Sequence, residues 1–182
     1  MNNSKGFTVW FTGLPGAGKS TLARLLEGKL RQLGLQAEVL DGDEVRKRLT
    51  KGLGFTREDR EENIRRIAYV ANLLSKVGAV AIVAAISPYA QSREEVRTEI
   101  ENFVEVFVKC SLKTCIERDP KGLYAKAQRG EISHFTGISD PYEEPKNPEI
   151  IIETDQEQPD ECLMKILSQL EKLDLLKHFT EA

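Results

Sequence analysis

A phosphate-binding loop constrains this chain more than any other feature of its sequence. A largely apolar stretch, 7–11, leads into 13–20, GLPGAGKS, which matches G-x-x-x-x-G-K-[ST] where a strand should end and a helix begin. Main-chain N–H groups of such a loop, with the N-terminus of the following helix, form a nest for phosphate oxygens. Lys19 adds a cation for the β- and γ-phosphates, and the Ser20 hydroxyl is placed to bind Mg²⁺. The sequence therefore predicts a nucleoside triphosphate site, in preference to a glycine-rich turn that binds nothing. The expected triphosphate contacts are Gly13, Leu14, Pro15, Gly16, Ala17, Gly18, Lys19, Ser20 and Thr21.

Length and composition exclude several classes of protein. The chain has 182 residues, enough for a substantial core, and we expect a single domain over 1–182. Its 26 basic and 29 acidic residues give a net charge of −3, so a basic surface for nucleic acid is not expected. No apolar run is long enough to cross a bilayer, which predicts a cytoplasmic protein without membrane contacts. Cys110, Cys115 and Cys162 form no C-x-x-C pair, and we expect buried thiols in a reducing compartment.

Strand-like and helix-like segments alternate along the chain. Strands are expected at 7–12, 37–40, 79–85, 103–109 and 150–153, and helices at 19–33, 43–50, 57–77, 92–100, 112–118 and 160–173. Short, largely apolar strands suit a parallel sheet whose two faces are both covered. The pattern predicts an α/β protein with a doubly wound five-stranded parallel sheet, helices on both faces and a P-loop nucleoside triphosphate hydrolase-like fold.

Residues 119–148 interrupt this alternation. Apolar periodicity fades there, and Gly, Pro and polar residues dominate. So long an irregular stretch in a compact domain is more often a functional lid than a passive loop. A lid that brings cations to the transferred phosphoryl group and excludes water suits kinase chemistry. Within it, Phe135 is a candidate for stacking on a base.

The ends of the expected strands carry candidate site residues, because ligands of a parallel sheet gather at the carboxyl ends. The second strand ends in Asp41-Gly42-Asp43, beside the phosphate loop. A carboxylate here can hold the Mg²⁺ shell or accept a proton from an attacking hydroxyl; the alternative is that Asp43 caps a helix. Arg46 follows one turn later and can bind a substrate anion. After the third strand, Ser87 either contacts the substrate or belongs to a turn before proline.

The expected helix at 57–77 carries polar residues on its inward face. Arg57, Arg60 and Asn63 project within about 60° of the apolar face that packs on the core. Polar residues there are costly unless a cleft or ligand receives them, so we expect Arg60 and Asn63 to face a ligand. An internal salt bridge or cap is the alternative. Phe55, just before the helix, either joins the core or stacks on a base.

The remaining motifs favour a small-molecule kinase over a nucleotide-dependent switch. Residues 119–122, DPKG, match the D-x-x-G of switch proteins, but they follow a helix, which places the aspartate poorly for Mg²⁺. The guanine-binding pattern N-K-x-D does not occur in the sequence. The residues alone predict phosphoryl transfer from ATP-Mg²⁺ to a small anionic acceptor that contains a base. Another nucleotide or nucleoside kinase and a non-catalytic nucleotide-binding regulator are the alternatives.

Longer motifs resemble the adenylyl-sulfate kinase family over nearly the whole chain. They occupy 13–21 (GLPGAGKST), 41–46 (DGDEVR), 55–66 (FTREDREENIRR), 86–88 (ISP), 118–124 (RDPKGLY) and 130–138 (GEISHFTGI). The stretches 55–66 and 118–138 are far more specific than the phosphate loop. The resemblance implies transfer of the ATP γ-phosphoryl group to the ribose 3′-hydroxyl of adenosine 5′-phosphosulfate (APS). It also implies a homodimer.

The same resemblance assigns roles to individual residues. Lys19 and Asp41 are implied in catalysis, with Asp41 acting as the base or, beside Ser20, in the Mg²⁺ shell. Ser87 matches a family position described as a phosphoserine intermediate, although direct in-line transfer needs no covalent step and nothing in the sequence supplies a base for it. Phe55 and Phe135 are implied to sandwich the acceptor's adenine. The implied acceptor contacts are Asp43, Arg46, Phe55, Arg60, Asn63, Ile86, Ser87, Lys121, Leu123, Phe135 and Thr136. The chain departs from the family pattern at Ala90 and at Ser139-Asp140.

Overall fold

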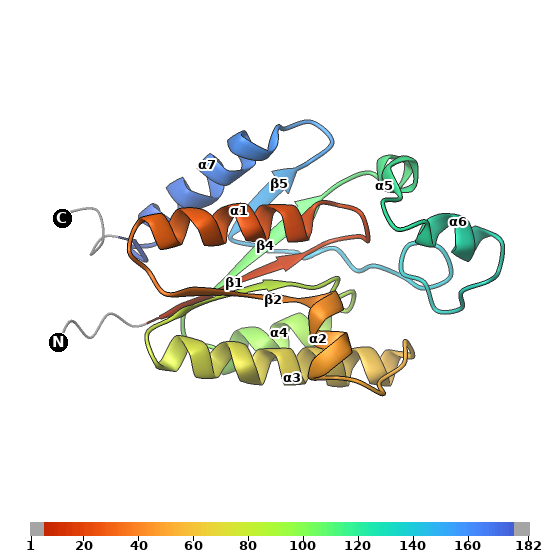
Figure 1. Ribbon diagram of the computed structural model, residues 1–182, viewed down its shortest axis with the longest axis horizontal. Coiled ribbons are helices and arrows are strands. Elements are labelled where there is room, and N and C mark those ends of the chain that lie inside the picture. Colours follow the sequence, from red (N-terminus) through yellow and green to blue (C-terminus); the bar gives the residue numbers. More distant parts are fainter. Residues whose placement is uncertain (1–5, 177–182) are drawn as a thin grey trace.

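A five-stranded parallel sheet forms the centre of the protein in the computed structural model, which describes residues 6–176 (Figure 1). Its order is β2-β3-β1-β4-β5, and every neighbouring pair is parallel. Because parallel strands need crossover connections, helices alternate with strands along the chain. This arrangement confirms the predicted doubly wound sheet. The strands are β1 (Phe7–Thr12), β2 (Ala37–Asp41), β3 (Val80–Ala84), β4 (Phe103–Lys109) and β5 (Ile150–Glu153).

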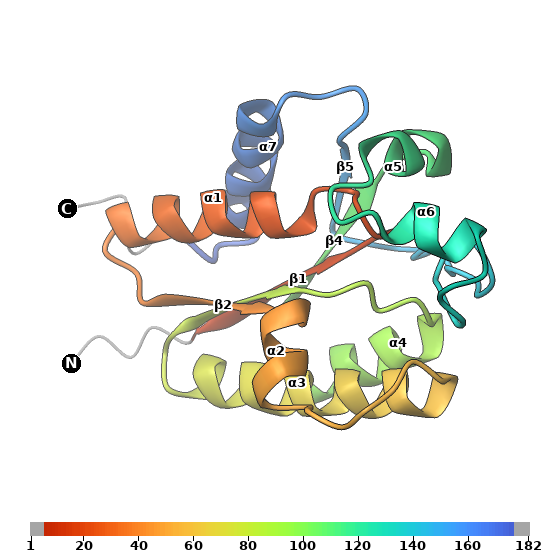
Figure 2. The same cartoon turned by 45° about the vertical axis from the view of Figure 1, so that its right-hand side comes forward.

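Helices cover both faces of the sheet (Figures 1 and 2). On one face lie α1 (Lys19–Gln32) and α7 (Pro159–Lys172), and on the other α3 (Arg57–Lys76) and α4 (Ala90–Glu99). Three shorter helices lie toward the carboxyl ends of the strands: α2 (Gly42–Arg48), α5 (Leu112–Arg118) and α6 (Leu123–Gln128). None of the helices within 6–176 is long and apolar enough to span a membrane.

Alternate residues of β1 supply the two halves of the core. Phe7, Val9 and Phe11 pack with α1 and α7, whereas Trp10 packs with α3 and α4. Successive side chains of a strand point to opposite faces, which explains this division. All four are at most 1% exposed, and burial of large apolar side chains stabilises by roughly 1.5–3 kcal/mol each. The packed sheet holds the loops at its carboxyl edge in fixed positions.

One part of the predicted lid is not irregular. The expected element boundaries agree with the structure within two residues, but α6 occupies 123–128, where no helix was predicted. The Asp119 carboxylate accepts hydrogen bonds from the N–H groups of Tyr124 and Ala125, both at 3.0 Å, and so stabilises the start of α6. A helix of six residues is too short to show apolar periodicity in the sequence.

Candidate active site

The phosphate loop connects β1 to α1 at the centre of the sheet (Figure 1). Gly13 approaches β4 so closely that a Cβ atom there would lie 2.5 Å from the carbonyl oxygen of Val108. Gly18 is the N-cap of α1 and has a φ of 102°, a left-handed conformation that favours glycine. Because it offers no side chain to cap the helix, the first-turn N–H groups can bind an anion. This cradle fits the triphosphate that the sequence predicts.

Lys19 is folded back into the loop. Its Nζ donates to the carbonyl oxygens of Gly13 and Leu14, at 2.9 and 2.7 Å, and its side chain is buried. Burial is the main cause that lowers the pKa of Lys19 from 10.5 to about 8. A desolvated cation interacts with phosphate oxygens more strongly than one in water. Lys19 is therefore suited to neutralise charge on a bound triphosphate.

Ser20 and Asp41 meet beside the loop. Ser20 Oγ donates to Asp41 Oδ2 at 2.5 Å, which joins the start of α1 to the end of β2. The other carboxylate oxygen accepts from the N–H of Asp43 at 3.0 Å and caps α2. The cap considered for Asp43 therefore belongs to Asp41, because α2 begins at Gly42, one residue earlier than predicted. A hydroxyl and a carboxylate in contact form a donor set that fits Mg²⁺, which also keeps water and phosphate ligands.

Two arginines face the ring of Phe55 on another wall of the site. The guanidinium carbon of Arg46 lies 4.4 Å from the ring centroid, and that of Arg60 lies 5.6 Å from it. Burial first, and the nearby charge of Arg60 second, lower the pKa of Arg46. Two cations held close together attract an anion. Phe55 is 50% exposed, so it does not join the core, and the part of its ring that the arginines leave open can stack on a base.

Arg60 and Asn63 are buried on the inward face of α3, as the helical pattern predicts. Arg60 Nε donates to the carbonyl oxygen of Phe55 at 2.9 Å, and its Nη2 donates to that of His134 in the lid. Asn63 Oδ1 accepts from Thr50 Oγ1 at 2.7 Å. The internal contacts that we weighed as the alternative are therefore present, and both side chains also line the cavity described below.

Arg57 does not share this inward orientation, so the prediction for it was wrong. Its side chain is 54% exposed and its Nε donates to Glu61 Oε1 at 2.9 Å. Because Arg57 is the first residue of α3, no preceding turn holds its side chain against the sheet.

The pair Ser139-Asp140, where the chain departs from the family pattern, ties the lid to itself and to α3. The Ser139 hydroxyl accepts from the N–H of Phe135 at 2.8 Å. Asp140 Oδ2 lies 3.6 Å from Arg60 Nη2, and both side chains are largely buried. Ser139 and Asp140 therefore hold the turn at 135–140 together and against Arg60 of α3.

Ser87 occupies a strained position just after β3. Its φ is 47°, in the left-handed region, and its side chain is buried. Trp10 Nε1 donates to Ser87 Oγ at 2.9 Å, and Ser87 Oγ in turn lies 3.4 Å from the carbonyl oxygen of Ala85. Neither an indole N–H nor a carbonyl oxygen removes a proton, so these partners do not activate Ser87 as a nucleophile.

The segment predicted to be a lid, 119–148, lines the site with apolar and polar groups. Lys121 forms an ion pair with Asp43 of α2. The ring of Phe135 packs edge-on against Tyr124, with centroids 5.0 Å apart. Thr136 Oγ1 is buried and has no hydrogen-bond partner in the described part of the chain. Since an unpaired buried hydroxyl is costly, this atom indicates a ligand that completes it.

One cavity of about 1080 Å³ brings these groups together. It is lined by every residue predicted for catalysis and for the acceptor, and by six residues of the phosphate loop. Three further loop residues do not line it: Gly13 faces β4, while Leu14 and Ala17 pack on the core. The loop residues in the lining are Pro15, Gly16, Gly18, Lys19, Ser20 and Thr21.

One wall of this cavity was not predicted from the sequence. Arg118 at the end of α5 and residues 154–159 after β5 line it. Arg118 Nη2 donates to the carbonyl oxygen of Thr154 at 2.6 Å, and Thr154 Oγ1 donates to that of Ala17 at 2.7 Å. The fifth strand ends at the same edge of the sheet as the others. Reading its carboxyl end in the same way would have indicated where this wall lies, although not which side chains form it.

Comparisons with known proteins agree with this arrangement. A family model for adenylylsulphate kinase matches residues 5–153. An adenylyl-sulfate kinase of Rippkaea orientalis is 59% identical over 172 residues, which cover 94% of this chain and 95% of that protein. A probable bifunctional SAT/APS kinase 2 of Sorangium cellulosum is 58% identical over 92% of this chain, and the chain spans only 29% of that relative.

Solved structures extend the likeness to three dimensions. The APS kinase CysC of Mycobacterium tuberculosis, in complex with AMPPNP and APS, has a TM-score of 0.88 and 49% identity, over 92% of this chain and 98% of that one. A gluconokinase from Sinorhizobium meliloti, with 18% identity and a TM-score of 0.63, shares the fold alone. The sequence motifs, the family model and these relatives agree, and the chain belongs to the adenylyl-sulfate kinase family.

Proposed function

We propose that this protein transfers the γ-phosphoryl group of ATP to the ribose 3′-hydroxyl of APS, which yields 3′-phosphoadenosine 5′-phosphosulfate. The observation that carries the proposal is that a single cavity joins the phosphate loop to the wall of Arg46, Phe55 and Arg60. Donor and acceptor therefore fit side by side, and holding two reactants together lowers the entropic barrier to transfer. The relatives named adenylyl-sulfate kinase and the CysC complex with AMPPNP and APS support the choice of substrates.

On the donor side, the loop and the start of α1 bind the phosphates of ATP. Lys19 exchanges its bonds to the carbonyl oxygens of Gly13 and Leu14 for bonds to phosphate oxygens. Ser20 and Asp41 hold Mg²⁺, which neutralises charge on the triphosphate when it is bound. We favour this shell role for Asp41 over that of a base, because its carboxylate already contacts the Ser20 hydroxyl.

On the acceptor side, charged groups bind one end of APS and aromatic groups bind the other. Arg46 and Arg60 bind the anionic end of APS, and Phe55 and Phe135 lie on either side of its adenine. The unpaired hydroxyl of Thr136 provides one further polar contact. Asp43, Asn63, Ile86, Ser87, Lys121 and Leu123 complete the acceptor contacts.

The transfer is direct, from one bound nucleotide to the other. Phosphoryl transfer depends mainly on positioning the two nucleotides and on stabilising the developing charge. The site provides for both, so a covalent enzyme intermediate is not needed. The contacts of Ser87 with Trp10 and Ala85 support this choice. Lys121 brings a cation from the lid, and the lid excludes water that would otherwise compete as the acceptor.

An assay of ADP release with APS, AMP and adenosine as rival acceptors tests the proposal. We expect turnover with APS and little with the other two. Asn63→Ala should raise the KM for APS and leave ATP affinity unchanged. Asn72→Ala is the matched control, because Asn72 is a half-buried residue of the same helix that donates to the carbonyl oxygen of Glu99 and does not line the cavity. Turnover with AMP but not with APS would contradict the proposal. An equal loss of ATP affinity in Asn63→Ala would show that Asn63 does not belong to the acceptor site alone.

We further infer that residues 1–182 form one domain that assembles as a homodimer in the cytoplasm. One sheet with two packed faces supports the single domain. The hexameric APS kinase from Thiobacillus denitrificans, 39% identical with a TM-score of 0.71, is a self-assembling relative of which this chain covers 29%, and it supports assembly of this chain. Buried free thiols at Cys110, Cys115 and Cys162 suit a reducing compartment. Light scattering should give twice the chain mass of 20.5 kDa, and a monomer would contradict the dimer.

A further inference from the structure

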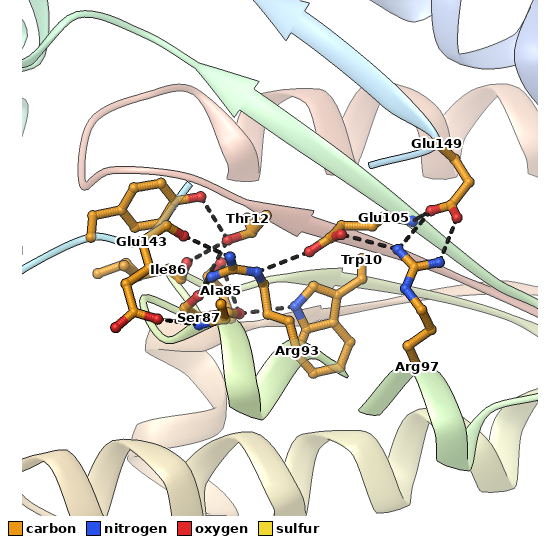
Figure 3. A network of polar contacts seen from close by, with 12 residues as sticks. Trp10, Thr12, Ala85, Ile86, Ser87, Arg93, Arg97, Glu105, Glu143 and Glu149 are labelled. Carbon is orange, nitrogen blue, oxygen red and sulfur yellow. Dashed lines mark hydrogen bonds and ion pairs between the residues drawn. The ribbon is translucent and has the colours of Figure 1, made fainter. Parts of the chain in front are cut away.

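An ion network centred on the buried pair Arg93–Glu105 lies next to residues 86–88, which line the cavity and which we call the acceptor wall (Figure 3). It contains Arg93 and Arg97 of α4, Glu105 of β4 and Glu149 just before β5. Arg93 Nε lies 2.9 Å from Glu105 Oε1, and Arg97 Nη2 lies 3.0 Å from Glu105 Oε2. The side chains of Arg93 and Glu105 are only 3% and 4% exposed. None of these four residues lines the cavity, so the network is not itself a ligand site.

Arg93 extends from this network to the main chain of the site. Its Nη1 donates to the carbonyl oxygen of Ser87 at 2.5 Å, and its Nη2 donates to that of Glu143 at 2.6 Å (Figure 3). The planar guanidinium thus holds Glu105, the turn after β3 and the end of the lid from three separate nitrogens. A lysine ammonium cannot reproduce this fixed fork.

The end of the lid, residues 142–143, is also bound to the same turn directly; we call it the lid root. The N–H of Glu143 donates to the carbonyl oxygen of Pro88 at 2.8 Å, and the N–H of Ala90 donates to Glu143 Oε2 at 2.7 Å. The Tyr142 hydroxyl lies 2.9 Å from Thr12 Oγ1. The lid root is therefore fixed to the sheet edge and to the start of α4.

Ser87 explains why such a tie is needed. Its left-handed backbone, with a φ of 47°, is costly for a residue with a side chain and persists only where the surroundings hold it. Arg93 holds its carbonyl oxygen, and Trp10 holds its hydroxyl. A buried ion pair such as Arg93–Glu105 often adds little to the stability of the fold. The contacts that Arg93 makes with the main chain of the site therefore explain better why the pair is buried here.

We propose that Arg93 is a positioning residue for the acceptor. Through Ser87 and Glu143 it keeps the acceptor wall at 86–88 and the lid root in one fixed arrangement, and Glu105 fixes Arg93 in turn. The role in acceptor binding rests on the proposed function, whereas the tie between wall and lid root does not. Within residues 6–176, the hydrogen-bond and ion-pair partners of the Arg93 and Glu105 side chains do not include the phosphate loop, which meets the acceptor wall through a long bond from the Gly13 N–H to the carbonyl oxygen of Ile86 at 3.4 Å. ATP binding should therefore depend on Arg93 much less than APS binding does.

Arg93→Lys tests the proposal, with Arg97→Lys as its matched control. Arg97 belongs to the same network and helix. Its hydrogen bonds go to the side chains of Glu105 and Glu149, and its guanidinium lies 5.1 Å from the ring centroid of Phe103, so it does not hold the main chain of the site. Loss of charge-assisted bonds in Arg93→Lys should raise the KM for APS about tenfold, with ATP affinity changed less than about twofold. Hydrogen exchange at the amides of Ala90 and Glu143 should become faster. In Arg97→Lys, both the KM and the exchange should stay near the wild-type values.

Hydrogen exchange separates this inference from the proposed function. If the wild-type protein does not use APS, the proposed function is wrong. Hydrogen exchange at the amides of Ala90 and Glu143 still reports whether Arg93 ties the lid root to the acceptor wall. Tyr142→Phe, which removes only the hydroxyl that contacts Thr12, should change KM and exchange in the same direction and serves if Arg93→Lys does not fold. Unchanged exchange at the lid root, equal losses of ATP and APS affinity, or equal effects in Arg97→Lys would each overturn the proposal.

Discussion

Lys121 of the lid and Asp43 of α2 form an ion pair across the cavity, although they lie 78 residues apart in the sequence. Their side chains are 57% and 59% exposed, so the pair contributes about 0–1 kcal/mol to stability at most. Both residues line the cavity, and a bound polyanion competes with Asp43 for Lys121. The contact therefore has more effect on ligand binding than on folding.

Lys121→Ala should impair transfer without destabilising the fold. A cation is lost near the transferred phosphoryl group, and we expect kcat/KM for APS to fall at least about tenfold. The melting temperature should move by no more than about 4 °C, because the ion pair is exposed and contributes at most about 1 kcal/mol. Lys126→Ala removes the same charge from α6 at a position outside the cavity and is the control. Similar losses of activity in both variants would show that the net charge of the lid, not Lys121, is responsible.

ATP affinity should depend on pH through Lys19. In the ligand-free protein, burial lowers the pKa of Lys19 from 10.5 to about 8, and a triphosphate beside the amine favours the charged form and raises the pKa again. ATP binding should therefore take up a proton above about pH 8 and none well below it, where Lys19 is already charged. Calorimetry near pH 9 in two buffers of different ionisation enthalpy measures this uptake.

The same pKa predicts how the stability of the ligand-free protein changes. Below about pH 8, Lys19 is protonated in both folded and unfolded states, and its buried charge opposes folding in full. Between about pH 8 and 10.5 only the unfolded state holds the proton, so the free energy of unfolding rises with pH. Lys19→Met should remove the proton uptake and flatten this rise relative to wild type. Uptake that persists in the variant would assign the proton to another group.

Ser87→Ala should retain kcat within about threefold of the wild type, because the change removes two neutral hydrogen bonds, with Trp10 and Ala85, and no reacting group. The change leaves the buried Trp10 N–H without this partner, which should lower the free energy of unfolding by about 1–3 kcal/mol. Steady-state kinetics and denaturant unfolding measure the two effects. Mass spectrometry of wild-type protein quenched during turnover looks for phosphate on Ser87. A phosphorylated Ser87, together with loss of transfer in Ser87→Ala, would contradict direct transfer and establish a covalent step.

Local signals in the sequence predicted most of the fold. Strand and helix periods gave the elements, and the phosphate loop located one half of the site. The inward positions of Arg60 and Asn63 followed from the helical wheel, because burial on one face of a long helix depends only on sequence spacing. Arg57 failed the same argument, since the first residue of a helix has no preceding turn to direct its side chain.

Contacts between distant segments were not predictable in this way. Glu105 lies within a strand that reads as apolar, and nothing in its neighbours indicates that Arg93 and Arg97 of α4 pair with it. The wall formed by Arg118 and Thr154 likewise depends on two segments that meet only in the folded chain. Such pairings are set by how elements pack, and a single sequence does not record which charged residues will meet.

Asp41→Asn separates the two roles considered for this carboxylate. Asparagine caps a helix about as well as aspartate, so the cap of α2 and the melting temperature should be preserved. Loss of the negative charge should lower kcat about a hundredfold or more and raise the Mg²⁺ concentration needed for half-maximal activity, as a shell ligand requires. Ser20→Ala should shift the Mg²⁺ requirement in the same direction. An unchanged Mg²⁺ requirement with a flattened pH–rate profile would make Asp41 the base, and near-normal turnover would exclude both roles.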